Sequence, residues 1–194
     1  MMTIPNILTI SRILLIPVIV ILYYFQPAYS EAPIFSWFNF SLVAAYAVVS
    51  ITDYFDGFLA RKMEMTSKLG EFLDPVADKL MVSTALILLV DYYPVESHWY
   101  ITLSAIIIIA REILVSALRE WMGTIGKRSN INVSWIGKVK TFMQIFAILF
   151  LLYQQPFFGL PSFEIGIILL LTATFLTLWS GFIYLKSGMK TLKA

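Results

Sequence analysis

Long runs of apolar residues dominate the chain and are separated by short polar stretches. Six of these runs, counted with their polar ends, have about the length that a helix needs to cross a bilayer, roughly 20 residues. They cover approximately residues 7–25, 38–52, 76–92, 100–118, 139–153 and 165–185. The second run continues directly into a segment that is rich in aspartate. This pattern predicts an all-α integral membrane protein, a bundle of six transmembrane helices.

The composition agrees with this prediction. Apolar residues make up 59% of the 194 residues and charged residues only 13%, whereas a soluble domain is about one quarter charged. The chain has no cysteine, which excludes disulfides, and its net charge of +2 is too small to indicate a nucleic-acid partner. No linker, repeat or low-complexity segment interrupts the pattern, so residues 1–194 are expected to form one membrane domain.

The basic residues indicate an orientation in the membrane. All 14 Lys and Arg residues lie in or beside the N-terminus, residues 61–79, residues 111–140 or the tail after residue 185. Three intervening stretches contain none: 25–40, 91–100 and 154–164. Because cytoplasmic loops carry an excess of Lys and Arg, both termini and the aspartate-rich segment are expected to face the cytoplasm.

Four aspartates recur at fixed intervals between residues 51 and 80. The order is Asp53-x-x-Asp56-Gly57-x-x-Ala60-Arg61, eight residues, then Gly70-x-x-x-Asp74-x-x-x-Asp78. At 100° per residue the first five positions share one broad helix face, and the last three align if a helix extends that far back. Alternatively, Asp74 and Pro75 fit an N-cap and a first helical position, with Gly70 in the preceding loop. Either arrangement lets the carboxylates converge between neighbouring helices.

Carboxylates gathered in this way need positive charge among them, because mutual repulsion would otherwise protonate some of them. Divalent cations such as Mg²⁺ prefer oxygen ligands and commonly bind carboxylates together with substrate phosphates. Gly57 and Ala60 leave the same helix face free of bulk, and Arg61 has a planar fork suited to phosphate. The segment therefore predicts a site for two metal ions and a pyrophosphate. Solvated aspartates at a helix end, or an ion-coupled carrier, are alternatives that do not require these intervals.

Small residues recur at spacing four on the last apolar run, at Ala173, Thr177 and Gly181. Such a stripe allows close contact between helices. Packing within the chain and a dimer face explain it equally well.

The segment between residues 51 and 80 resembles the signature of the CDP-alcohol phosphotransferases at every fixed position. Residues 5–12, 110–121 and 135–141 are also similar to the bacterial phosphatidylglycerophosphate synthases, so the resemblance spans nearly the whole chain. It implies a homodimeric enzyme of phospholipid biosynthesis in the bacterial inner (cytoplasmic) membrane, with its active site facing the cytoplasm. Such an enzyme joins CDP-diacylglycerol to sn-glycerol 3-phosphate, releases CMP, and uses Mg²⁺ or Mn²⁺, with two ions expected.

The resemblance also implies roles for the signature residues. Asp53, Asp56 and Asp74 would hold the metals, and Asp78 would act as general base and also touch a metal. The positions around the nucleotide would be Thr9, Asp56, Gly57, Ala60, Arg61 and Gly70.

The acceptor phosphate needs cationic partners, and four are candidates: Arg111, Arg119, Lys138 and Lys140. Arg111 is the strongest, because it follows the apolar run 106–110 and should lie within the bundle. Arg119 could instead interact with the negative end of its helix. These basic residues favour a phosphorylated acceptor, although the signature alone also fits relatives that use another alcohol, such as serine or inositol phosphate.

Overall fold

The computed structural model describes residues 4–25, 37–63, 68–124, 135–156 and 159–193. Within its helices, the side chains of residues 4–8, 38, 53–63, 68–69, 71–72 and 187–193 lie outside this description. The described part consists of six α-helices and contains no regular strand. The helices are α1 (Ile4–Tyr24), α2 (Trp37–Met63), α3 (Lys68–Tyr92), α4 (Val95–Thr124), α5 (Trp135–Tyr153) and α6 (Ser162–Lys193). The all-α prediction is confirmed for these residues.

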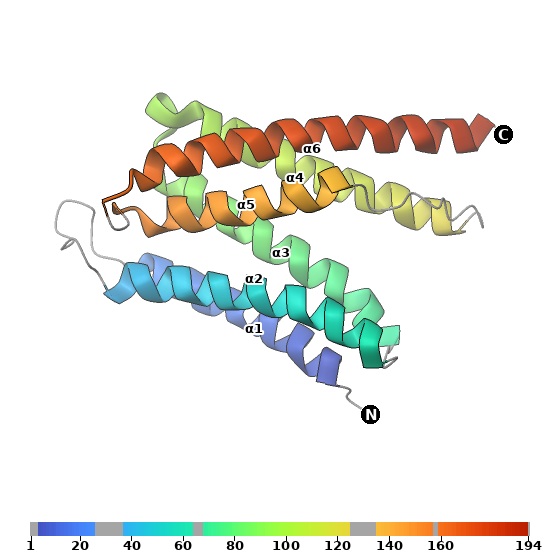
Figure 1. Cartoon of the computed structure of the whole chain (residues 1–194), viewed down its shortest axis with the longest axis horizontal. Coiled ribbons are helices and arrows are strands. Elements are labelled where there is room, and N and C mark those ends of the chain that lie inside the picture. The colour runs from blue at the N-terminus through green and yellow to red at the C-terminus, as the bar shows by residue number, and fades with distance from the viewer. Residues whose placement is uncertain (1–3, 26–36, 64–67, 125–134, 157–158, 194) are drawn as a thin grey trace.

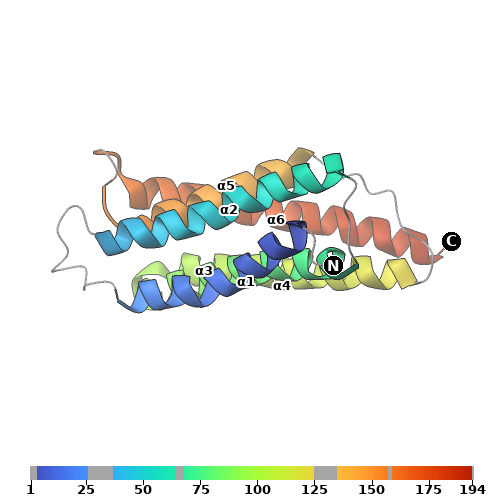
Figure 2. The ribbon, with the colours of Figure 1, turned by 90° about the horizontal axis from the view of Figure 1, so that it is seen from below.

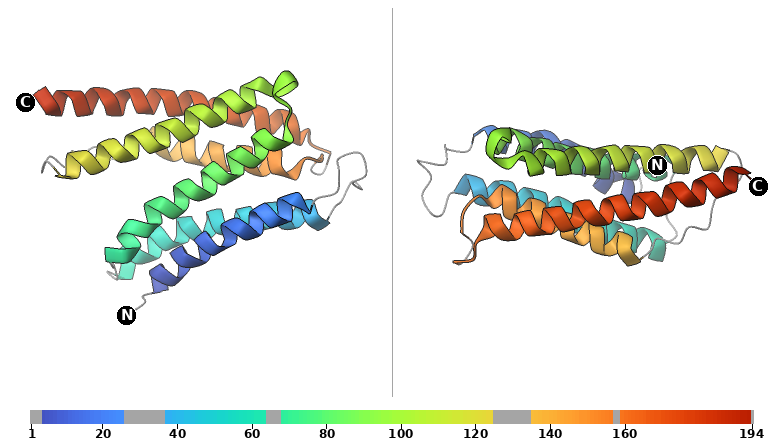
Figure 3. Two further views of the ribbon diagram at one scale, coloured as in Figure 1. Left: turned by 180° about the vertical axis from the view of Figure 1, so that it is seen from behind. Right: turned by 90° about the horizontal axis from the view of Figure 1, so that it is seen from above.

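The helices form two layers. Figure 2 shows α1, α3 and α4 in one layer and α2, α5 and α6 in the other, and the right-hand view of Figure 3 shows the same division from above. Helix α3 packs against α1 and α4 within its layer and against α5 across the interface. The fully buried side chains include Leu42 and Tyr46 of α2, Leu89 of α3 and Ile148 of α5. The core therefore lies between the two layers.

The outer surface of the bundle is apolar. On α6 alone, Phe175, Trp179 and Phe182 are each more than half exposed, which suits contact with lipid better than contact with water. Three helices are long and apolar enough to cross a membrane, namely α4, α5 and the part of α6 up to Lys186. Shorter apolar segments lie in α1 and α2. A membrane protein is thus supported, while six spans and cytoplasmic termini stay predictions.

Close packing of α5 against α6 depends on a glycine. A Cβ atom at Gly166 would stand 2.8 Å from Cγ of Leu151 and 3.3 Å from Cβ of Phe150. Only a residue without a side chain leaves room for these two α5 side chains against the backbone of α6. The small-residue stripe of α6 is also used inside the chain, because Ala173 and Thr177 are fully buried.

Because successive helices run antiparallel, six helix ends lie at the same end of the bundle. These are the N-terminal ends of α1, α3 and α5 and the C-terminal ends of α2, α4 and α6, and they lie on the right in Figure 1. The parts of the signature that lie in α2 and α3, and the basic residues of α4 and α5, fall at this end of the bundle. The fold therefore gathers the predicted site residues that are far apart in sequence.

Candidate functional site

The first half of the signature lies on the last turns of α2, which continues to Met63. The backbone of Asp53, Asp56, Gly57, Ala60 and Arg61 is helical, as predicted. The side chains of this half lie outside the described residues, so their predicted metal and nucleotide contacts stay predictions.

The second half of the signature lies inside α3, which begins at Lys68. Asp74 is therefore not an N-cap, and the alternative that placed Gly70 in a loop is wrong. Pro75 is accommodated within the helix, where it removes one backbone donor. Gly70, Asp74 and Asp78 follow one another at spacing four and share a helix face.

Helix α1 contacts both signature aspartates of α3, Asp74 and Asp78. The Thr9 hydroxyl donates to Oδ1 of Asp74, and Nη1 of Arg12 donates to Oδ1 of Asp78 at 2.9 Å. The other terminal nitrogen of Arg12, Nη2, lies 3.7 Å from Oδ1 of Asp74. Thr9 and Arg12 are one helical turn apart, as are the two aspartates, so the four side chains join α1 and α3 at two levels.

The guanidinium of Arg12 lies on the buried side of the two carboxylates. The Arg12 side chain is 4% exposed, whereas the side chains of Asp74 and Asp78 are 44% and 45% exposed. The carboxylates are thus held from the buried side, and close to half of each side chain is exposed on the other. Half-open carboxylates suit a divalent cation with oxygen ligands. Within the described residues no group of three or more acidic or histidine side chains is assembled, and the two further predicted ligands, Asp53 and Asp56, lie outside them.

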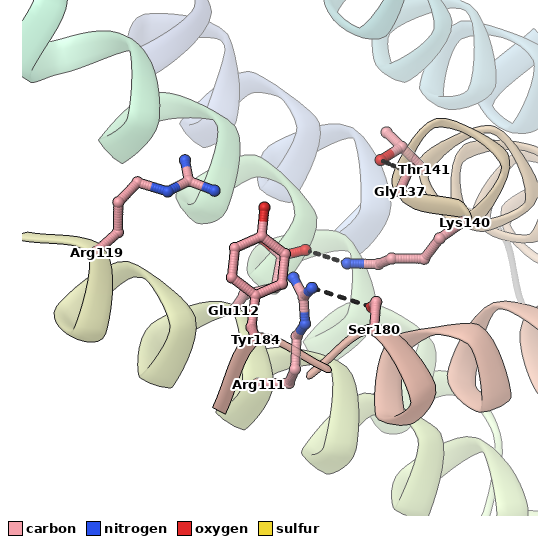
Figure 4. Close-up of a pocket in the computed structure, with 8 residues that line it drawn as sticks. All are labelled: Arg111, Glu112, Arg119, Gly137, Lys140, Thr141, Ser180 and Tyr184. Carbon is pink, nitrogen blue, oxygen red and sulfur yellow. Dashed lines mark hydrogen bonds and ion pairs between the residues drawn. The ribbon is translucent and has the colours of Figure 1, made fainter. Parts of the chain in front are cut away.

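A second polar site lies between α4, α5 and α6 at the same end of the bundle. It is a pocket of about 170 Å³. The lining residues, drawn in Figure 4, are Arg111, Glu112, Arg119, Gly137, Lys140, Thr141, Ser180 and Tyr184. Three of the four predicted phosphate ligands line this pocket; Lys138 does not, and it is exposed.

Arg111 is held by α6. Its Nη2 donates to Oγ of Ser180 at 3.0 Å, and its guanidinium carbon lies 5.7 Å from the centre of the Tyr184 ring. Gly181 makes room for the arginine, since a Cβ there would stand 3.2 Å from Cγ of Arg111. The Nε atom of Arg111 is buried and has no hydrogen-bond partner among the described residues. The pocket thus contains a cation whose position is fixed by α6.

Lys140 is paired with an acid. Its Nζ lies 2.7 Å from Oε1 of Glu112, and its side chain is only 4% exposed. This ion pair joins α5 to α4 in the pocket (Figure 4). Arg119 lies more than one turn before the end of α4 at Thr124. Since the helix dipole acts mainly within the last turn, a pocket role explains its position better than stabilisation of the helix end.

Six residues of these two sites were not given roles from the sequence: Arg12, Glu112, Gly137, Thr141, Ser180 and Tyr184. The signal for Arg12 and Glu112 was present, because each is a charged residue within an apolar run, where charge is costly unless it is used. Ser180 and Tyr184 gave no comparable signal. Their importance depends on the packing of α6 against α4.

The family model of CDP-alcohol phosphatidyltransferases matches residues 2–179. The chain therefore belongs to this family, which confirms the resemblance found in the signature. It is 46% identical to the CDP-diacylglycerol–glycerol-3-phosphate 3-phosphatidyltransferase of Pectobacterium atrosepticum over 189 residues, 97% of this chain and 96% of the relative. The proteins of the same name from Shigella flexneri and Escherichia coli are each 43% identical over the same shares of the two chains.

Proposed function

We propose that this protein transfers the phosphatidyl group of CDP-diacylglycerol to sn-glycerol 3-phosphate, giving phosphatidylglycerophosphate and CMP. The observation that carries the proposal is the pairing of two unlike sites at one end of the bundle. One presents the signature carboxylates Asp74 and Asp78, and the other presents two arginines around a small pocket. A reaction between a nucleotide-activated lipid and a phosphorylated alcohol needs both kinds of site.

The arginine pocket suits the phosphate of the acceptor. Arg111 and Arg119 supply two positive charges for a dianion, and the planar fork of a guanidinium matches the geometry of phosphate oxygens. Ser180 and Tyr184 hold the guanidinium of Arg111 in place, which lowers the entropy that binding would otherwise cost. Lys140 would act through Glu112, whereas Lys138 is a weaker candidate for phosphate contact.

The carboxylates suit the diphosphate of the lipid donor. Asp53, Asp56, Asp74 and Asp78 would hold Mg²⁺ or Mn²⁺, with two ions expected, which would supply charge stabilisation to the phosphate oxygens. Thr9, Gly57, Ala60, Arg61 and Gly70 would surround the nucleotide together with Asp56. Gly70 is buried one turn before Asp74, so the helix face there is free of bulk.

Asp78 would take the proton of the acceptor hydroxyl as its oxygen forms a bond to the phosphatidyl phosphorus. The bond between that phosphorus and the bridging oxygen breaks, and CMP leaves with the electron pair. Arg12 fixes the direction of the Asp78 carboxylate, because its contact with Oδ1 comes from the buried side.

The location that fits this chemistry is the cytoplasmic membrane of a bacterium. Six spans with both termini in the cytoplasm would place the two sites at the inner surface, where a water-soluble acceptor meets a lipid donor. Homodimer formation is part of the proposal by analogy with the family. Membrane lipids would cover the exposed apolar side chains of α4, α5 and α6.

In the decisive experiment, purified protein is incubated with CDP-diacylglycerol and one acceptor at a time, and the release of CMP is measured. Release is expected with sn-glycerol 3-phosphate and not with serine, inositol or inositol phosphate. Release with only one of the other acceptors would assign the protein to a different branch of the family. An ion-coupled carrier predicts no CMP release with any acceptor and transport into reconstituted vesicles. The Asp78→Asn variant serves as the inactive control.

A further inference from the structure

A single carboxylate lies among the cations of the acceptor pocket. Glu112 follows Arg111 on α4, and its Oε1 accepts a hydrogen bond from Lys140 at 2.7 Å. The Glu112 side chain is 24% exposed, while that of its partner is 4% exposed. The acid thus faces the pocket, and the lysine supports it from the bundle interior.

This arrangement is not required for binding phosphate. A carboxylate beside a bound dianion repels it, and Lys140 does no more than cancel that repulsion. Replacing a buried ion pair by apolar residues of similar size is often neutral or stabilising. The same net charge in the pocket, that of two guanidinium groups, would follow if both members of the pair were apolar. The pair therefore needs a reason other than net charge or stability.

The carboxylate offers what the arginines lack, a hydrogen-bond acceptor. An ionised carboxylate has two oxygens and accepts several hydrogen bonds, and the contact with Lys140 is made at Oε1. The groups of a small phosphate ester that donate are its hydroxyls. The pocket, at about 170 Å³, far exceeds the roughly 10–15 Å³ that one water needs. Phosphate on the arginines and a hydroxyl on Glu112 would use every charged group that lines the pocket.

We propose that Glu112 determines acceptor specificity by accepting a hydrogen bond from the hydroxyl of sn-glycerol 3-phosphate that does not react. That group is the secondary hydroxyl at C2, which lies between the reacting primary hydroxyl and the phosphate ester. Lys140 is a positioning residue in this scheme, since it holds the carboxylate in place without touching the acceptor. The inference rests on the proposed function and adds to it the part of the acceptor that is recognised.

The test compares sn-glycerol 3-phosphate with 3-hydroxypropyl phosphate, which lacks only the C2 hydroxyl. Wild-type protein is expected to prefer the first by roughly 10- to 100-fold in kcat/KM, the usual effect of losing a hydrogen bond to a charged group. The double variant Glu112→Met with Lys140→Met removes the carboxylate and leaves the net charge of the pocket unchanged. Its preference ratio should fall to within about three-fold of unity, because the one carboxylate that lines the pocket is lost and only hydroxyl oxygens, which are weaker acceptors, remain.

Two variants keep the result decisive. Glu112→Gln, which retains shape and a weaker acceptor, should give an intermediate ratio and serves if the double variant does not fold. Glu120→Gln removes an exposed acid from the same helix outside the pocket, and its ratio should equal that of wild type. An equal loss of kcat/KM for both acceptors, with the ratio preserved, would show a structural pair and overturn the inference alone. Absence of CMP release by wild type with either acceptor would overturn the proposed function as well.

Discussion

Arg12 and Asp78 are 66 residues apart in sequence, yet Nη1 of the arginine lies 2.9 Å from Oδ1 of the aspartate. The contact joins the first turns of α1 to the part of α3 that carries the end of the signature. Because the arginine is buried and the carboxylate is half exposed, the arginine holds the acid from the bundle interior. The N-terminal helix therefore belongs to the site as much as the signature does.

This relationship predicts the effect of Arg12→Lys. Lysine keeps the charge but cannot span Asp74 and Asp78 with a planar fork, so the proposed base should lose its fixed direction. A misplacement of about 1 Å can cost roughly 100-fold in rate, and we expect kcat to fall by about 10- to 100-fold with KM for the acceptor changed only a few-fold. Steady-state release of CMP measures both constants. An unchanged kcat would contradict a positioning role.

Replacement of Asp74 or Asp78 by asparagine should have different effects at the two positions. Asp78→Asn is expected to lower turnover by at least about 100-fold, because a general base contributes roughly 10²- to 10⁴-fold, while metal-dependent nucleotide binding is largely retained. Asp74→Asn should weaken that binding itself. Titration of each variant with a CDP-lipid in the presence of Mn²⁺, alongside CMP release, separates the two effects. Near-normal turnover of Asp78→Asn would mean that another group accepts the proton.

Gly181→Ala should weaken acceptor binding without touching the acceptor. The added Cβ would stand 3.2 Å from Cγ of Arg111, so the arginine must shift by a few tenths of an ångström in the pocket. We expect KM for sn-glycerol 3-phosphate to rise by roughly 3- to 10-fold, the effect of weakening one charge-assisted hydrogen bond. KM for CDP-diacylglycerol is the internal reference and should stay constant.

A matched control is available on α4. A Cβ at Gly123 meets nothing within 4 Å, so Gly123→Ala tests the same chemical change without a clash. The KM for sn-glycerol 3-phosphate and the KM for CDP-diacylglycerol should both remain those of wild type. A parallel rise of KM in the two variants would mean that glycine replacement acts through the helices in general and not through Arg111.

Gly166→Ala probes the contact between α5 and α6. Its Cβ would lie 2.8 Å from Cγ of Leu151, which forces the helices or the leucine to move. Overpacking of this kind costs about 1–3 kcal/mol, part of which is offset by the roughly 1 kcal/mol gain in helix propensity. We expect a lower thermal midpoint in detergent and nearly unchanged activity per folded molecule. A midpoint at or above that of Gly123→Ala would contradict the tight contact.

The helices themselves could be predicted from the sequence because a helix that crosses a bilayer needs about 20 mostly apolar residues. Each predicted apolar run lies within one observed helix, except that residue 25 falls just beyond α1, and the helices extend past the polar ends of the runs. The start of α3 was ambiguous, because Asp74 and Pro75 satisfy the local rules for a helix start equally well. Contacts with α1, through Thr9 and Arg12, outweigh the cost of proline within the helix.

The site was predictable in its residue types and not in its pairings. The spacing of the signature indicates that Asp74 and Asp78 share a face, and apolar context places Arg111 inside the bundle. Nothing local indicates that Lys140 is paired with Glu112 or that Arg111 rests on α6. Those contacts depend on how helices distant in sequence are packed, which periodicity does not report.

Because the described contacts of both candidate sites lie at one end of the bundle, the proposed function requires of the opposite halves of the helices only that they pack together and match the thickness of the bilayer. Adding or removing a turn there, about 5.4 Å, would alter the fit to the membrane without moving any group of either site. Under the proposed function, the geometry of the candidate sites and the fit to the lipid depend on different parts of each helix, so one can change while the other is kept.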